Sequence, residues 1–141
     1  MPPLHSELLE QCREFCKNTL LETLKIEFIE VGEQSLTARM PVDQRVHQPD
    51  GVLHGGASIA LAETVGSAAA IIFNKDRGVQ VRGIEISANH VKSVAAGFVY
   101  ATATAVHFGR TTQLWQIPVK DEDGNLLSMI KLTTITLASN K

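Results

Sequence analysis

The sequence predicts an α+β fold in which an antiparallel sheet of about six strands wraps around one long central helix. A stretch without proline, apolar apart from Glu63, runs from residue 56 to residue 73 and has the length of a helix. After it, apolar residues alternate with a period of two through four runs rich in β-branched side chains. A single helix that covers one face of so large a sheet requires the sheet to curl around it. The 141 residues are expected to form this one domain, 1–141.

The first element expected along the chain is a short amphipathic helix over residues 5–19. Its apolar and thiol side chains recur at three-and-four spacing: Leu8, Leu9, Cys12, Phe15 and Cys16. Two alternating segments follow, at 25–32 and 35–42, and the short connection after Gly32 indicates a hairpin. A loop over 43–51 then ends in turn-forming residues shortly before the central helix.

Residues 74–78 end the central helix with polar side chains and a glycine. Four strands are expected after it, at 79–91, 97–109, 111–120 and 126–137. Because the connections between them are short, we expect these strands to form an antiparallel meander.

The composition argues against several classes of partner. The net charge is −2 and the 13 Lys and Arg residues are scattered, so the basic patch that nucleic acid requires is missing. No stretch reaches the roughly 20 uncharged apolar residues of a membrane span, and the N-terminus lacks a signal core. We therefore expect a soluble, cytoplasmic protein that binds neither nucleic acid nor membrane. Cys12 and Cys16 are expected to be reduced thiols.

Glu63 is the most informative residue of the central helix. A helix that is apolar on every face is predicted to be buried all round, which would place Glu63 in the interior. An ionised carboxylate there is costly unless it is paired, hydrogen-bonded or neutralised. Glu63 is therefore expected either to form a core salt bridge, with Arg82 or Lys92, or to take part in chemistry.

A family resemblance begins just before this helix. The residues QPDGVLHGG at 48–56 are followed by Glu63 and, one turn further on, by Ser67. In this order and spacing they resemble the hotdog-fold acyl-CoA thioesterases, most of all the 4-hydroxybenzoyl-CoA and 1,4-dihydroxy-2-naphthoyl-CoA thioesterases with a glutamate on the central helix. The strand pattern and the segments 88–91 and 107–110 also fit, so the resemblance covers nearly the whole chain.

The resemblance implies a hotdog fold and an assembly of several copies. Members of this family form homodimers by pairing two sheets edge to edge, and the dimers are usually doubled to a homotetramer. Their active sites are shared across the dimer interface. We expect the same assembly for this chain.

The start of the central helix is the expected catalytic centre. Its first turn supplies free backbone N–H groups and a partial positive charge for a developing oxyanion. We assign the Gly55 N–H as the oxyanion donor, with Gly56 allowing close approach of the substrate carbonyl. Glu63 is the candidate nucleophile or general base. Ser67 either orients that carboxylate or a water, or hydrogen-bonds back to the helix carbonyl at position 63.

Two side chains of the preceding loop have both a functional and a structural interpretation. His54 either orients the thioester or protonates the leaving thiolate, or it simply caps the helix. Gln48 either hydrogen-bonds the thioester or the attacking water, or it is an ordinary loop amide. The resemblance favours the functional interpretation of both, and we expect them to act in catalysis.

Coenzyme A carries phosphates, which require cationic or hydrogen-bonding groups. His90, Lys92 and Ser93 follow one another at the end of a strand and Arg110 precedes another, where the resembling family holds the nucleotide. Strand-end cations are otherwise usually solvated. The sequence has no phosphate-binding glycine loop, no G-x-S-x-G elbow and no cluster of metal ligands, so neither a metal nor a redox cofactor is expected.

The expected function is hydrolysis of an acyl-CoA thioester, with an aromatic acyl group favoured by the resemblance. A hotdog hydratase or dehydratase would need a base placed to take the proton alpha to the carbonyl, and the position of Glu63 argues for hydrolysis instead. A non-catalytic acyl-CoA-binding or regulatory module would have little reason to keep Glu63 buried and charged. The sequence leaves open whether attack proceeds through an anhydride or through an activated water.

Overall fold

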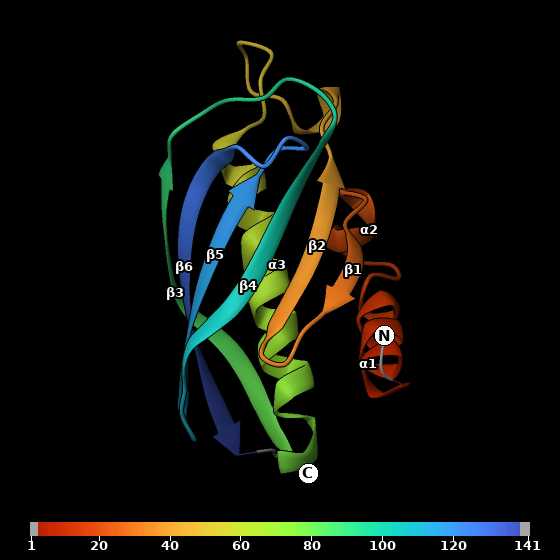
Figure 1. Ribbon diagram of the computed structural model, residues 1–141, viewed down its shortest axis with the longest axis vertical. Helices are drawn as coiled ribbons and strands as arrows, with labels where there is room; N and C mark the ends of the chain where they lie inside the picture. The colour runs from red at the N-terminus through yellow and green to blue at the C-terminus, as the bar shows by residue number, and fades with distance from the viewer. Residues whose placement is uncertain (1–2, 139–141) are drawn as a thin grey trace.

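The computed structural model describes residues 3–138 as one curled sheet around one helix (Figure 1). The helices are α1 (Pro3–Phe15), α2 (Leu20–Thr23) and α3 (Gly55–Phe73), with single 3₁₀ turns η1 (Gln44–Val46) and η2 (Lys75–Arg77). The strands are β1 (Glu27–Val31), β2 (Ser35–Pro41), β3 (Val79–His90), β4 (Phe98–Phe108), β5 (Thr112–Lys120) and β6 (Leu126–Ala138). This is the predicted α+β hotdog architecture, with a short N-terminal helix and six strands.

The six strands form one antiparallel sheet in the order β1-β2-β4-β5-β6-β3. The predicted meander is correct for β4, β5 and β6 and wrong for β3, which pairs with β6 at the far edge. Strand β4 pairs with β2 instead.

The physical reason lies in the connection between β3 and β4. Backbone groups of this connection bond to the segment before α3: Leu53 N–H donates to Val94 O at 2.8 Å, and Val42 N–H donates to Gly97 O at 2.8 Å. His47 Nε2 also lies 2.8 Å from Ala95 O. The connection therefore crosses over the start of α3, and β4 begins on the other side of the helix (Figure 1).

Helix α3 packs on the inside of the curved sheet and contacts β2, β3, β4, β5 and β6. Gly66 brings the helix close to the sheet, because a Cβ there would lie 2.5 Å from Leu132 Cδ2 and 2.9 Å from Ile117 Cδ1. The helix has a mean hydropathy of 1.6 and would suit a membrane span by length and composition alone. Its packing makes it the core helix of the sheet.

The prediction that α3 is buried on every face is wrong in this chain. One stripe of the helix lies outside the sheet and reaches solvent, and it contains Gly56, Glu63 and Ile71 as exposed residues. Helix α1 contacts α3 and β1 but does not bury this stripe. Cys12 of α1 is fully buried, and this burial raises the pKa of its thiol to about 12. Both cysteines are free thiols, as predicted.

Candidate active site

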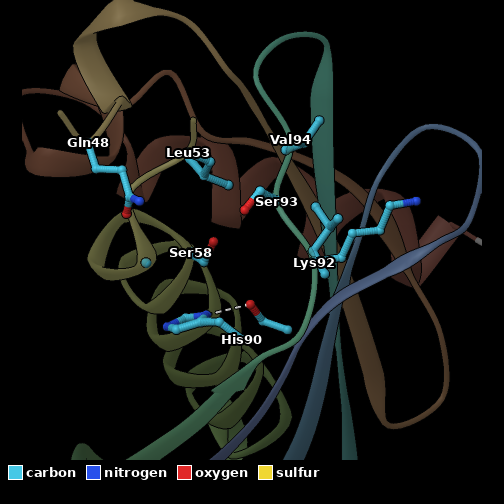
Figure 2. A pocket seen from close by; sticks show the side chains of 10 residues that line it. Gln48, Leu53, Ser58, His90, Lys92, Ser93 and Val94 are labelled. Carbon is cyan, nitrogen blue, oxygen red and sulfur yellow. Dashed lines mark hydrogen bonds between the residues drawn. The ribbon is translucent and has the colours of Figure 1, made fainter. Parts of the chain in front are cut away.

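Two separate hollows are lined by seven of the ten candidate residues, all except His54, Gly56 and Arg110. The first, called here the Gly55 hollow, has a volume of about 150 Å³ and is lined by Gln48, Leu53, Gly55, Ser58, His90, Lys92, Ser93, Val94, Leu127 and Ser128 (Figure 2). The second, called here the Glu63 hollow, has a volume of about 400 Å³ and is lined by Phe15, Leu20, Leu21, Ala60, Glu63, Thr64, Ser67, Ala68 and Ile71.

The first turn of α3 forms the floor of the Gly55 hollow. His54 is the N-cap residue, and its Nδ1 accepts a hydrogen bond from the Gly56 N–H at 2.8 Å. His54 therefore caps the helix, as its structural interpretation predicted. Within residues 3–138, the Gly55 N–H donates to no protein acceptor. A free N–H at a helix N-terminus is suited to bind an oxyanion.

The two glycines leave room for histidine rings as well as for a substrate. A Cβ at Gly55 would lie 2.8 Å from His90 Nε2, and one at Gly56 would lie 2.9 Å from His54 Nδ1. His90, expected to contact the nucleotide of coenzyme A, therefore lies against the helix N-terminus. Its other ring nitrogen, Nδ1, is 2.6 Å from Ser128 Oγ (Figure 2).

The remaining predicted residues of the Gly55 hollow differ in their orientation. Gln48 lines the hollow, and its amide Nε2 donates to Asp50 Oδ1 at 2.9 Å, which is the ordinary loop interaction. Ser93 also lines it. The Lys92 side chain extends away from Ser58 and His90, so its ammonium group lies outside the hollow (Figure 2).

Glu63 is exposed in this chain, which contradicts its predicted burial. It forms no ion pair in the described residues, so neither proposed salt bridge exists there. The Arg82 guanidinium donates instead to Val81 O at 2.8 Å. The error has a simple origin: the stripe that carries Glu63 faces out of the sheet, between β3 and α1.

Ser67 and Glu63 lie together, as their spacing on the helix predicts. Both line the same hollow, and both approach Gly83 of β3. A Cβ at Gly83 would be 3.1 Å from Glu63 Oε2 and 3.8 Å from Ser67 Oγ. The carboxylate and the hydroxyl therefore lie beside the edge strand, with an apolar hollow next to them.

Arg110 lies at the opposite end of the molecule from His90, Lys92 and Ser93, so one chain does not bring these four residues together. The Arg110 carbonyl accepts hydrogen bonds from Arg77 Nη2 and Thr136 Oγ1, both at 2.7 Å. Thr136 is eight residues along β6 from Ser128, a separation of about 26 Å in a strand.

The two hollows also cannot act on one carbonyl within a single chain. Gly55 and Glu63 are eight residues apart on α3, which separates them by about 12 Å along the helix axis and places them on different faces. Nucleophile and oxyanion donor must both be near contact distance of the reacting carbon. One chain thus supplies two incomplete halves of a site.

Of the lining residues that were not foreseen as part of the site, four bear on its chemistry. Phe15, Leu20 and Leu21 form the apolar wall of the Glu63 hollow, and only the amphipathic pattern around Phe15 gave a signal, as packing surface. Ser128 had no signal, because Leu127 and Ser128 are both buried and the alternation of β6 is interrupted there.

Known proteins are similar to this chain in sequence and in fold. The family model of the thioesterase superfamily matches residues 50–128. The proofreading thioesterase EntH of Cronobacter turicensis is 44% identical over 92% of this chain and 93% of its own length. The 1,4-dihydroxy-2-naphthoyl-CoA hydrolase of Escherichia coli K12 is 41% identical over 92% of this chain and 94% of its own length. A mutant thioesterase from Pseudomonas aeruginosa has a crystal structure that matches with a TM-score of 0.88 at 41% identity, over 92% of this chain and 93% of that chain.

Proposed function

Because this chain belongs to the thioesterase superfamily, whose members hydrolyse thioesters, we propose that two copies of it combine their hollows into active sites that hydrolyse acyl-CoA. The observation that carries the proposal is the position of Glu63. It is an exposed carboxylate on a helix face whose other residues are uncharged, beside a mainly apolar hollow of about 400 Å³. A carboxylate in that position has no structural partner in the described chain and is free to act on a bound acyl group.

The edge strand β3 supports the pairing of two chains. It has one neighbour, β6, and exposes Ile84 at 56%, and Val91, the residue directly after the strand, is exposed at 63%. An unpaired edge with apolar side chains favours association with another strand. Antiparallel pairing of β3 with its copy about a two-fold axis, in a register centred midway between Gly83 and His90, would place Gly83 beside His90 of the partner subunit. Glu63 of one chain would thereby approach the Gly55 hollow of the other.

Each residue of such a shared site is assigned one role in catalysis. The Gly55 N–H binds the oxyanion that forms as the thioester carbonyl is attacked, and Gly56 leaves room for that carbonyl. Glu63 attacks directly or activates a water, and Ser67 beside it orients the carboxylate or that water. Gln48 hydrogen-bonds the thioester or the water. His54 uses the ring edge that does not cap the helix to orient the thioester or to protonate the leaving thiolate.

The substrate is proposed to be an aromatic acyl-CoA. One relative is named for a naphthoyl-CoA thioester, and the Glu63 hollow is lined by Phe15 and leucines that would contact a ring. Lys92, Ser93 and Arg110 are proposed to contact the nucleotide, with Arg110 supplied by a different chain from the other two. We expect the assembly to be a soluble cytoplasmic homotetramer of two such dimers.

The proposal is tested by the release of free thiol from a panel of aryl and alkyl acyl-CoAs. We expect hydrolysis that is fastest with aryl substrates. Glu63→Gln should retain the stability and oligomeric state of the wild type, since the side chain is exposed, and should lose turnover by about two orders of magnitude or more. Turnover retained by Glu63→Gln would remove Glu63 from the mechanism, and a wild type inert to every acyl-CoA would refute the proposed substrate class.

A further inference from the structure

The Gly55 hollow contains one short hydrogen bond that the scheme above does not use, between His90 Nδ1 and Ser128 Oγ at 2.6 Å (Figure 2). His90 ends β3 and Ser128 stands directly opposite it on β6. We propose that Ser128 is a positioning residue that holds His90 as a second hydrogen-bond donor to the oxyanion. The proposal rests on the thioester hydrolysis proposed above.

The direction of this hydrogen bond follows from the burial of Ser128. Its side chain is only 2% exposed, and within the described residues its hydroxyl bonds to no side chain other than His90. A buried O–H group requires an acceptor, and Nδ1 is the one within reach. Ser128 therefore donates to Nδ1. The proton of the neutral imidazole must then be on Nε2, because a ring nitrogen that accepts carries none.

The Nε2–H group faces the first residue of α3. Nε2 lies 2.8 Å from the place that a Cβ at Gly55 would occupy. The free Gly55 N–H belongs to the same residue, and Gly55 and His90 border the same hollow. Two N–H groups that converge on one oxygen stabilise its developing charge more than one alone. The opposite tautomer would point a lone pair at the oxyanion and repel it.

Glycine at position 55 is needed for this arrangement. Any larger residue would collide with the His90 ring at its Nε2 edge. The absence of a side chain therefore serves the second donor as well as the approach of the substrate.

Kinetics of three variants test the proposal: Ser128→Ala, His90→Ala and the double variant. We expect kcat to fall about tenfold in Ser128→Ala and about a hundredfold in His90→Ala, with KM changed less than about threefold in both. The double variant should be no slower than His90→Ala, because Ser128 acts only through His90. Multiplicative losses in the double variant, or wild-type kcat in Ser128→Ala, would overturn the proposal.

Thr134→Val provides a matched control on the same strand. Thr134 is also fully buried, and its hydroxyl bonds to Trp115 and Gln113 at a distance from the hollow. Loss of that hydroxyl should lower stability and leave kcat unchanged. A fall in kcat equal to that of Ser128→Ala would show that any damage to β6 slows the enzyme, which would also overturn the proposal.

The tautomer can be read without substrate by ¹H–¹⁵N correlation of the imidazole groups at alkaline pH. The His90 signals are those missing from His90→Ala. We expect the Nε2–H tautomer in the wild type and a mixture in Ser128→Ala. The Nδ1–H tautomer in the wild type would refute the inference, even if Ser128→Ala failed to fold. A wild type with the expected tautomer that cleaves no acyl-CoA would refute the proposed function instead.

Discussion

His54 and Gly55 are neighbours in the chain with complementary positions at the start of α3. His54 Nδ1 accepts a hydrogen bond from the Gly56 N–H, whereas the Gly55 N–H has no acceptor in the described residues and can donate to a ligand. The cap fixes the first turn and so fixes the direction of the free N–H. A structural role for His54 is therefore part of how the site is built, and it does not exclude a second role for the other edge of the ring.

Two variants of His54 separate these roles. His54→Ala removes both the cap and the ring and should cost about 1 kcal/mol in the free energy of unfolding. His54→Asn keeps a capping side chain and should retain the stability of the wild type. If the ring contacts the thioester, both variants should lose kcat by about tenfold or more. Urea unfolding and steady-state kinetics measure the two effects, and wild-type kcat in His54→Asn would leave His54 as a cap alone.

At the residue scale, the sequence predicted which residues belong to the site better than it predicted their burial and their neighbours. Glu63 was singled out because it is the one ionisable residue in an apolar helix, and it does border a hollow. Its predicted burial failed because composition cannot tell a helix enclosed by its own chain from one with an open face. Ser128 was missed because its role depends on His90, 38 residues away in sequence and opposite it in the sheet.

At the scale of elements, α3 and the sheet fit together through small residues. Gly66→Ala should destabilise the fold by about 1–2 kcal/mol, since overpacking at Leu132 and Ile117 outweighs the better helix propensity of alanine. The free energy of unfolding in urea measures the effect. Adding Leu132→Val should recover part of the loss by opening space. If the two substitutions lowered the free energy of unfolding additively, the contact between positions 66 and 132 would not limit the packing.

The order of strands shows which part of a fold local sequence can predict. Each strand was expected close to its observed position, because alternation and turn residues are local signals. The place of β3 at the sheet edge depends on hydrogen bonds between the segments 42–54 and 91–97, which no local pattern reveals. That edge position exposes β3 and gives Glu63 its open surroundings.

The helices α1 and α2 contribute the apolar wall of the Glu63 hollow. Leu20 is 60% exposed and lines that hollow, so its removal should leave stability unchanged. For bulky aryl acyl-CoAs, Leu20→Ala should lower kcat/KM by about fivefold through lost apolar contact, with little effect on acetyl-CoA. Leu137→Ala, at an exposed leucine of β6, is the matched control. If Leu20→Ala lowered kcat/KM equally for aryl acyl-CoAs and for acetyl-CoA, this wall would have no part in recognising the acyl group.

At the scale of the whole molecule, the oxyanion donor and the carboxylate of one chain lie in two separate hollows. Gly55 and Glu63 are about 12 Å apart along the axis of α3 and lie on different faces of it, so their groups do not act on the same carbonyl. An assembly of two chains about a two-fold axis would bring each carboxylate to the partner's oxyanion donor. The central claim is therefore that every active site is built from two copies of the chain.

Mixing two variants, each expected to have lost most of its turnover, tests this claim directly. Chains with Glu63→Ala lack the carboxylate, and chains with Gln48→Ala lack the amide that lines the Gly55 hollow. In a mixed dimer one of the two shared sites carries both substitutions and the other carries neither. After complete exchange at equal concentrations, half of the dimers are mixed, so about a quarter of the wild-type turnover should return. No recovery of turnover, with subunit exchange demonstrated by differently tagged chains, would contradict the shared site.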